Sequence, residues 1–266
     1  MVLKFLSLAS GSSGNCYFLG ADDYGILLDA GIHFQTLKKI LRDHRIDLNQ
    51  ILAVFITHDH IDHIKSVGSL GEKHGIPVYA TQLVHTGINS CRIIKKKLRT
   101  SCRILEKEQA VAIREFTITA FDVPHDASDC VGYLIQYDHH TCVLATDVGE
   151  INPTVAKYLR MANHLILETN YDKEMLLSGN YPDFLKERIM NGKGHLCNAE
   201  AAEFLAANYD GHLKNIWLCH LSKNNNRPEL ACRSVEQAFV DHGIQIDSYI
   251  RLTALQRTTP ELYVLE

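Results

Sequence analysis

Three histidines and two aspartates fall within six consecutive positions of this chain. The cluster consists of His58, Asp59, His60, Asp62 and His63. It directly follows an apolar run at residues 51–56, which is typical of a buried strand. Imidazole suits zinc, and carboxylates suit harder divalent ions such as manganese. The alternative interpretation is a helix start that is rich in these residues without a metal.

The geometry expected of a strand end would divide this cluster between two ions. Side chains alternate along a strand, so His58 and His60 would project from one face. Asp62 and His63 would begin a helix and point elsewhere. One strand end can therefore serve two neighbouring metals, an arrangement used to hydrolyse phosphoesters.

Three further strand ends carry an acid or an imidazole. They are His125 after residues 116–123, Asp147 after residues 142–145, and His220 after residues 216–218. Loops at strand ends converge into functional sites, so all three are candidate ligands. Each also has an alternative interpretation when taken alone: His125 as a loop histidine, Asp147 as a turn aspartate and His220 as a core histidine.

The ligand set then suggests two divalent metal ions, zinc or manganese. We expect one ion to be held by His58, His60 and His125, the other by Asp62, His63 and His220, with Asp147 bridging both. A bridging carboxylate reduces the repulsion between two dications. A water between the ions would be acidified toward neutral pH and would become the attacking hydroxide.

Bulk composition is that of an ordinary globular protein. The chain has 266 residues, 46% hydrophobic and 22% charged, with a formal net charge of −4. It is therefore no polycation, and nucleic-acid binding would need the metals or a local basic patch. Strand and helix signals alternate throughout, including a helix at residues 229–242 with Pro228 in its first turn. We expect one α/β (α+β) domain over residues 1–266, with two sheets packed face to face and helices outside.

Cysteine and histidine usage adds further expectations. None of the 8 cysteines forms a Cys-x-x-Cys pair, and no export signal or long apolar span is visible. These features predict a cytoplasmic protein without a membrane segment. Five histidines in polar contexts are expected at the surface: His74, His139, His140, His212 and His242.

The pattern His-x-His-x-Asp-His at residues 58–63, followed in order by His125, Asp147 and His220, resembles the metallo-β-lactamase superfamily. The resemblance implies a four-layer αββα sandwich of two mixed β-sheets flanked by helices. It says little about substrate, because the superfamily includes lactamases, thioesterases, oxidoreductases, phosphodiesterases and nucleases.

Finer features resemble the bacterial YycJ (WalJ) family, which is related to ribonuclease Z. They are Leu-Ala-Ser-Gly-Ser-Ser-Gly-Asn at residues 8–15, His-Asp-Ala at 125–127, Gly-His-Leu at 194–196 and His-Leu-Ser-Lys-Asn-Asn at 220–225. The resemblance implies a metal-dependent 5′→3′ exonuclease acting on DNA. The chain departs from the family pattern at Cys197, where serine is expected, and at Tyr171, where histidine is expected; neither is a predicted ligand.

In ribonuclease Z-like enzymes, a glutamate at a strand end orients a histidine that protonates the leaving oxygen. By order along the chain, Glu168 and His195 match these positions. The chemistry is sensible, because a sugar alkoxide leaves poorly and a carboxylate-paired imidazolium can supply its proton. The predicted catalytic residues are Asp62, Asp147, Glu168 and His195. The alternative is a helix-capping histidine beside an unrelated glutamate.

Two polar loops and one basic stretch are candidates for contacts with phosphate. The loop residues are Ser12, Ser13 and Asn15, and, after His220, Ser222, Asn224 and Asn225. The basic stretch at residues 92–103 contains six Lys or Arg and no acid. It predicts salt-sensitive nucleic-acid affinity or, alternatively, a solvated helix face. Residues 172–193 would form either a helical arm that grips substrate or a plain insertion.

The first functional hypothesis is a metal-dependent phosphodiesterase acting on nucleic acid, specifically a 5′→3′ DNA exonuclease. DNA is favoured over RNA as partner, and self-association is left open. The second is a hydrolase of a small thioester, lactam or cyclic nucleotide on the same metals, which has no evident use for Glu168 and His195. The third is a non-hydrolytic regulator or binding module, which would not need the full ligand set.

Overall fold

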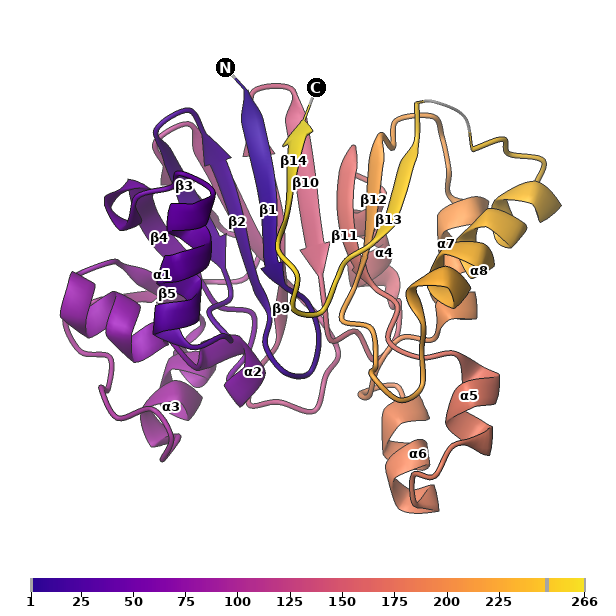
Figure 1. The fold of residues 1–266 in the computed structure, drawn as a ribbon, viewed down its shortest axis with the longest axis horizontal. Coiled ribbons are helices and arrows are strands. Elements are labelled where there is room, and N and C mark those ends of the chain that lie inside the picture. Colours follow the sequence, from indigo (N-terminus) through magenta and orange to yellow (C-terminus); the bar gives the residue numbers. More distant parts are fainter. Residues whose placement is uncertain (1, 247–248, 266) are drawn as a thin grey trace. The chain divides into compact units, whose positions relative to one another are not determined.

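The computed structural model describes residues 2–246 and 249–265. It divides into two compact units: unit 1 is Met1–Gln109, Ala127–Cys130 and Gln256–Glu266, and unit 2 is Ala110–Asp126 and Val131–Leu255. Each unit contains one mixed seven-stranded sheet with helices beside it (Figure 1). The prediction of two mixed sheets flanked by helices is confirmed. That residues 1–266 act as a single domain stays a prediction.

Unit 1 is built on a sheet with the strand order β14-β1-β2-β3-β4-β5-β6. Its strands are β1 (Leu3–Ala9), β2 (Cys16–Ala21), β3 (Tyr24–Leu28), β4 (Ile51–Phe55), β5 (Val78–Ala80), β6 (Cys102–Ile104) and β14 (Glu261–Leu265). Its helices are α1 (Phe34–Asp43), α2 (Ile61–Ile64) and α3 (Gln82–Ser90), with a 3₁₀ turn η1 (Leu48–Gln50) and a π turn η2 (Ser69–Lys73). The pairing is antiparallel from β14 to β3 and parallel from β3 to β6.

Strand β4 shows why the apolar run before the histidine cluster forms a buried strand. It lies between β3 and β5 and is parallel to both. Such a strand is covered on both faces and reads as a continuous hydrophobic run. Helix α1 covers one face by burying Leu37, Ile40 and Leu41 in the same core as Val54. The cluster therefore begins where a rigid strand ends.

Unit 2 is built on a sheet with the strand order β13-β12-β11-β10-β9-β8-β7. Its strands are β7 (Ala110–Ile113), β8 (Phe116–Asp122), β9 (Val131–Tyr137), β10 (His140–Ala145), β11 (His164–Glu168), β12 (Asn215–Cys219) and β13 (Arg251–Ala254). Its helices are α4 (Pro153–Leu159), α5 (Lys173–Ser178), α6 (Asp183–Met190), α7 (Asn198–Ala207) and α8 (Pro228–Asp241). Helix α4 packs on β8 and β10, and α8 packs on β13 and α7. None of the helices in the described ranges has the length and hydrophobicity that crossing a bilayer requires.

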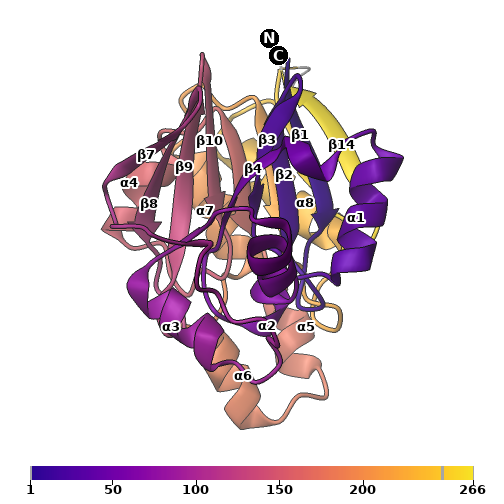
Figure 2. The ribbon, with the colours of Figure 1, turned by 90° about the vertical axis from the view of Figure 1, so that its left-hand side faces the viewer.

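Helices α5 and α6 form an arm that extends beyond the strand ends of unit 2 (Figures 1 and 2). The segment at residues 172–193 is thus largely helical. A small apolar cluster of Tyr171, Leu176 and Cys197, with Tyr181 and Ile189 against it, anchors the arm. Helix α6 has no buried residue, and Phe184 is 72% exposed. The arm is therefore fixed at its base and open along α6.

The expectation that His140 lies at the surface is wrong. His140 is the first residue of β10 and is 2% exposed. Its Nδ1 lies 2.9 Å from Nε2 of His164, and Asn215 donates a hydrogen bond of 2.8 Å to Nδ1 of His164. The polar neighbours suggested a surface loop, but the β10–β11 pairing carries the ring inward.

This buried pair predicts a pH-dependent stability. Burial lowers the pKa of His164 to about 3, against a usual value of about 6.5. Between these two pKa values the unfolded chain binds a proton at position 164 that the folded chain does not bind. The contribution of neutral His164 to the free energy of unfolding is therefore complete above the usual histidine pKa and decreases as the pH falls toward 3. From about pH 7.5 to about pH 5, wild type should lose about 2 kcal/mol more than His164→Asn.

Urea titrations at both pH values measure this difference in the free energy of unfolding. His212→Asn removes a histidine whose side chain is 79% exposed and should keep the wild-type pH dependence. The same pH dependence in His164→Asn and wild type would show that the buried pair contributes nothing to it.

Candidate metal centre

Four strands of unit 2 end at the same edge of the sheet, and each carries a functional side chain at its end or shortly after it. Strands β10, β11 and β12 are parallel neighbours, with Ala145 beside Leu167 and Glu168 beside Cys219. Strand β8 runs in the same direction, because β8 and β10 are both antiparallel to β9. Glu168 is the last residue of β11, and His125, Asp147 and His220 follow the ends of β8, β10 and β12. Topology alone therefore gathers the predicted residues of unit 2.

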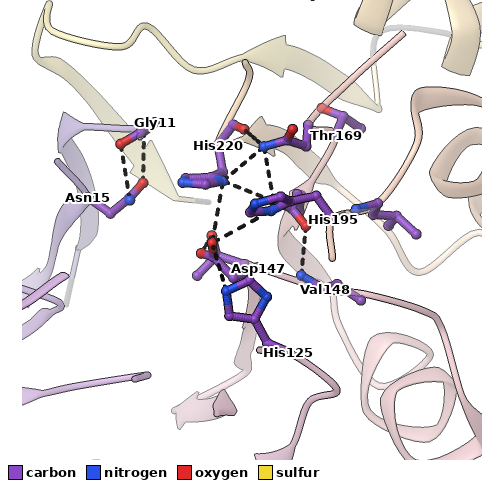
Figure 3. A network of polar contacts seen from close by, with 12 residues as sticks. Gly11, Asn15, His125, Asp147, Val148, Thr169, His195 and His220 are labelled. Carbon is purple, nitrogen blue, oxygen red and sulfur yellow. Dashed lines mark hydrogen bonds and ion pairs between the residues drawn. The ribbon is translucent and has the colours of Figure 1, made fainter. Parts of the chain in front are cut away.

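Asp147 lies among three imidazoles. Its Oδ1 is 3.7 Å from Nε2 of His125, 3.7 Å from Nδ1 of His195 and 3.6 Å from Nδ1 of His220. Figure 3 shows these three rings turned toward Asp147. Thr146 donates a hydrogen bond of 2.8 Å to the other carboxylate oxygen and fixes the orientation of the group. Oδ1 of Asp147 therefore faces the three rings.

Glu168 is the buried centre of the hydrogen bonding behind these rings. Its Oε1 accepts from Nδ1 of His195 at 2.8 Å and from Nδ1 of His220 at 2.9 Å. Its Oε2 accepts from the backbone N–H groups of Val148 at 2.7 Å and Leu196 at 3.1 Å. An ionised carboxylate only accepts, so both imidazoles place a proton on Nδ1. Glu168 therefore orients both histidines, one of them a predicted ligand.

The electrostatics of this pair favour its ionised form. Burial raises the pKa of the Glu168 carboxyl, but the charge of His195 and hydrogen bonds from His195 and His220 outweigh it, so that the pKa lies below its usual value. Burial lowers the pKa of His195, but the Glu168 carboxylate outweighs it and holds the pKa above its usual value. A carboxylate and an imidazolium in contact stabilise each other's charge in this way.

The tautomers in unit 2 suit metal binding. A histidine that binds a metal through one nitrogen usually donates its other N–H to a carboxylate or a carbonyl. His220 donates Nδ1–H to Glu168, and His125 donates Nδ1–H to the carbonyl of Gly194 at 3.0 Å. Both rings thereby keep the lone pair on Nε2. The Asp147 and His220 backbones also adopt φ values of 56° and 54°, an uncommon conformation that is concentrated at functional sites.

In unit 1, Asp29 organises the end of β4. It follows β3 directly, has φ 59° and is fully buried. Its carboxylate accepts from the Thr57 N–H at 2.9 Å and from the Thr57 hydroxyl at 3.1 Å and 3.0 Å. It also accepts from Nδ1 of His63 at 2.7 Å. The lone pair of His63 therefore lies on Nε2, as a metal ligand requires.

The predicted ligands of unit 1 lie close together. The rings of His58 and His63 have centroids 4.0 Å apart, and those of His58 and His60 are 4.6 Å apart. Oδ2 of Asp62 lies 3.7 Å from Nε2 of His63. As expected from the sequence, Asp62 and His63 fall in a short helix, α2, which begins at Ile61.

Gly31 allows this segment to pack closely. A Cβ at Gly31 would lie 1.5 Å from the backbone oxygen of Asp62, so only glycine fits. Asp59, the other acid of the cluster, makes different contacts. Its carboxylate accepts a hydrogen bond from the Ser128 hydroxyl at 2.6 Å. It also packs so closely on Gly87 that a Cβ there would lie 1.8 Å from it. Asp59 therefore holds local structure.

Replacing Asp29 with asparagine should lower the affinity for divalent metal about 10- to 100-fold. Loss of a carboxylate that orients a metal-binding histidine typically has an effect of this size. The amide oxygen can accept from one group but no longer neutralises the buried His63–Thr57 network. Competition with a chromophoric chelator measures the affinity. Asp43→Asn removes an exposed carboxylate of the same unit and should bind metal as wild type does. Equal affinity in Asp29→Asn and Asp43→Asn would contradict this role of Asp29.

Donor chemistry shows that both units suit a divalent metal. Ligand atoms of Asp147, Glu168, His195 and His220 all lie within 4.8 Å of one another in unit 2. Unit 1 supplies the imidazoles and the Asp62 carboxylate described above. Such N and O donors suit zinc and manganese alike. The allocation of individual ligands to two ions, with Asp147 bridging, stays a prediction.

The polar loops are built differently from each other. Ser12 and Ser13 are exposed, whereas Asn15 is buried and exchanges two hydrogen bonds with the backbone of Gly11 (Figure 3). The Asn15 amide also lies 3.0 Å from Nε2 of His63. Ser222, Asn224 and Asn225 lie in the loop after His220, where Ser222 accepts from the Asn225 N–H. Substrate binding by these six residues stays a prediction.

The basic stretch is a loop after α3 whose last two residues belong to β6, so the helix-face interpretation is wrong. Ile94 and Leu98 are buried, and Asn89 holds the backbone of Leu98 through two hydrogen bonds. Glu72 accepts from the backbone N–H groups of Arg99 and Ser101, and these bonds lower its pKa to about 2. The exposed cations of the stretch are Arg92, Lys95, Lys96, Arg99 and Arg103.

Three residues that organise the site were not predicted: Asp29, Thr57 and Asn170. Asn170 donates to the His220 carbonyl at 2.9 Å and holds the loop that carries this ligand. Asp29 follows a strand directly, as the predicted ligands do, so the same rule could have identified it. Thr57 and Asn170 become recognisable only from their contacts.

Comparison with known proteins finds relatives over most of the chain. A model of the β-lactamase superfamily domain matches residues 24–213. The exodeoxyribonuclease YycJ of Bacillus anthracis is 32% identical over 92% of this chain and 92% of its own length. The exodeoxyribonuclease WalJ of Streptococcus pneumoniae D39 is 33% identical over 97% and 96%. Among solved structures, the metallo-β-lactamase fold protein YhfI of Bacillus subtilis has a TM-score of 0.71 at 17% identity, covering 99% of this chain and 100% of YhfI.

Proposed function

We propose that this chain, which belongs to the metallo-β-lactamase superfamily and within it to the YycJ and WalJ exodeoxyribonuclease family, hydrolyses the phosphodiester bonds of DNA from the 5′ end. The chain is a metal-dependent hydrolase by family. The finer assignment to DNA follows the names of these relatives. The 5′→3′ polarity follows the family resemblance of the sequence motifs. A cytoplasmic location is part of the same proposal.

The observation that carries this proposal is the contact between Glu168 and His195. A buried carboxylate holds an imidazole at 2.8 Å, beside the Asp147 carboxylate. A thiolate leaves a thioester without a proton, whereas the alkoxide of a sugar is a poor leaving group and benefits from a proton donor. His195 is the least buried of the three rings around Asp147, with 23% of its side chain exposed, so substrate can reach it.

The metals are part of the proposal. His58, His60 and His125 would hold one ion, Asp62, His63 and His220 the other, and Asp147 would bridge them. When bound, such ions polarise a phosphoryl group and provide a nucleophile at neutral pH. The chain's own contributions are the orientation of His63 by Asp29 and of His220 by Glu168, and the proton that His195 would donate to the departing oxygen.

The test uses protein reconstituted with Zn²⁺ or Mn²⁺ and single- and double-stranded DNA and RNA with 5′-phosphates, labelled at either end. Stepwise loss of nucleotides from the 5′ end of DNA, stopped by a chelator, is the expected result. Cleavage of RNA alone would change the substrate. Hydrolysis of a thioester or a cyclic nucleotide without cleavage of any polymer would move the function to small molecules.

A further inference from the structure

A surface rich in cations covers three segments of unit 1: helix α1, the turn η2 with His74 after it, and the basic stretch. Its exposed cations are Lys38 from α1, Lys73 from η2, and Lys95, Lys96 and Arg99 from the basic stretch. None of the five forms an ion pair with a carboxylate in the described part of the chain. We call these five residues the basic surface.

His74 shows that the three segments lie together. Its ring stacks on Phe34, the first residue of α1, with the ring centroids 4.9 Å apart. Partial desolvation lowers the pKa of this imidazole, and the charges of Lys73, Lys38 and Lys96 lower it further. One cation from each segment therefore acts on the same ring.

The basic stretch is packed tightly on the segment around η2. A Cβ at Gly68 would lie 2.3 Å from the backbone oxygen of Lys96, and a Cβ at Gly71 would lie 2.4 Å from Oγ of Ser101. A side chain fits at neither glycine, so the two segments are in direct contact. The cations are thus carried on an ordered backbone, which reduces the entropy lost when they bind a partner.

The acids of these segments are already bonded to protein groups. One oxygen of Glu72 accepts from the Arg99 N–H at 2.8 Å, and the other accepts from the Thr100 hydroxyl at 3.1 Å. Asp43 of α1 pairs with Lys39 at 2.6 Å. The whole chain has a formal net charge of −4, so the basic surface is a local concentration of positive charge on an acidic protein.

We propose that the basic surface binds the sugar–phosphate backbone of the DNA strand that is being hydrolysed, an inference that rests on the proposed nuclease function. Five exposed cations on three segments suit the regular charges of a polyanion, and such a patch is the electrostatic footprint of nucleic-acid binding. The helix that carries Asp62 and His63 leads through a short segment into η2. The basic surface is therefore built next to the histidine cluster along the chain.

Fluorescence anisotropy tests this inference on the full chain in the presence of a chelator, where hydrolysis does not compete. The probe is an internally labelled single-stranded DNA, and its affinity is measured over a range of salt concentrations. Each phosphate contact contributes about −0.7 to the slope of log affinity against log salt. Lys95→Gln/Lys96→Gln should make this slope shallower by about 1.4 and lower the affinity at least about tenfold at about 0.1 M salt. Unchanged slope and affinity would overturn the proposal.

Matched variants locate the effect. Lys95→Arg/Lys96→Arg keeps both charges and should keep the wild-type slope. Lys38→Gln and Lys73→Gln should each make the slope shallower by about 0.7, because the three segments act on one strand. Arg233→Gln/Arg251→Gln removes two exposed cations of unit 2 and should bind as wild type does. An equal loss in this last variant would show that net charge governs binding, and would overturn the assignment.

Anionic lipid is the other polyanionic partner that such a surface could meet. Vesicles of phosphatidylglycerol and phosphatidylcholine are therefore sedimented with wild type and with Lys95→Gln/Lys96→Gln. We expect no difference between the two proteins. Vesicle binding that is lost in the variant, together with unchanged DNA binding, would overturn the proposal and assign the surface to a membrane.

The two proposals fail separately in this design. If metal-loaded protein cleaves no nucleic acid, the proposed function fails, while binding in chelator still decides whether the basic surface holds DNA. If the enzyme cleaves DNA, Lys95→Gln/Lys96→Gln should raise KM for the strand about tenfold and leave kcat within about twofold. Hydrolysis of bis-p-nitrophenyl phosphate, which has a single phosphate, should be unchanged. A fall in kcat on both substrates at unchanged KM would contradict a binding role, and thermal unfolding confirms that the variants are folded.

Discussion

Replacing Asp62 with asparagine is expected to lower kcat on DNA about 10³-fold, equivalent to a loss of about 4 kcal/mol in transition-state stabilisation. Asp62 is the carboxylate of the histidine cluster whose Oδ2 lies 3.7 Å from Nε2 of His63. An amide oxygen carries no charge and is a weaker ligand for a divalent ion. The prediction depends on the proposed role of Asp62 in metal binding.

The chain offers a matched control three positions away. Asp59 belongs to the same cluster, but its carboxylate accepts from the Ser128 hydroxyl at 2.6 Å and packs against Gly87. An asparagine at position 59 can keep the hydrogen bond from Ser128. Asp59→Asn should therefore retain turnover within a fewfold of wild type, whereas Asp62→Asn should not.

Three measurements make the comparison decisive: turnover on DNA, metal content by mass spectrometry, and thermal unfolding. We expect Asp62→Asn to hold less metal and to melt close to wild type, because asparagine has nearly the same size and shape as aspartate. Wild-type turnover with unchanged metal content would remove Asp62 from the ligand set. A large loss in Asp59→Asn would show that the whole segment, and not one carboxylate, governs the effect.

The candidate ligands were predictable because their signal is local. Each stands directly after an apolar run, and parallel strands bring such ends to one edge of a sheet. The organising contacts depend on pairing between distant segments. Asp29 reaches Thr57 and His63 only because β3 and β4 are parallel neighbours, and a single sequence does not state which strands pair.

The errors have the same origin. His140 stands in a polar stretch, yet it is buried because β10 pairs with β11 and carries its ring against His164. The basic stretch has the composition of a solvated helix face, but buried Ile94 and Leu98 and hydrogen bonds to Glu72 shape it as a loop. In both cases the sequence showed that the residues are polar or charged. The surroundings of that charge were set by tertiary contacts.

Replacing His195 with alanine is expected to lower kcat on DNA about 10²- to 10⁴-fold and kcat on bis-p-nitrophenyl phosphate less than about tenfold. A sugar alkoxide is a poor leaving group and needs a proton, whereas p-nitrophenolate leaves without one. His195 holds a hydrogen bond of 2.8 Å to Glu168, which keeps the pKa of the imidazole above its usual value despite burial. The ratio between the two substrates therefore reports on proton donation alone.

Two further variants complete this test. Glu168→Gln should lower turnover on both substrates, because Glu168 orients His220 as well as His195. His212→Ala, at a side chain that is 79% exposed, should leave both rates unchanged. Equal losses on both substrates in His195→Ala would assign His195 to positioning or metal binding. A selective loss on DNA would identify it as the proton donor, because no purely structural role of the ring distinguishes an alkoxide from a phenolate.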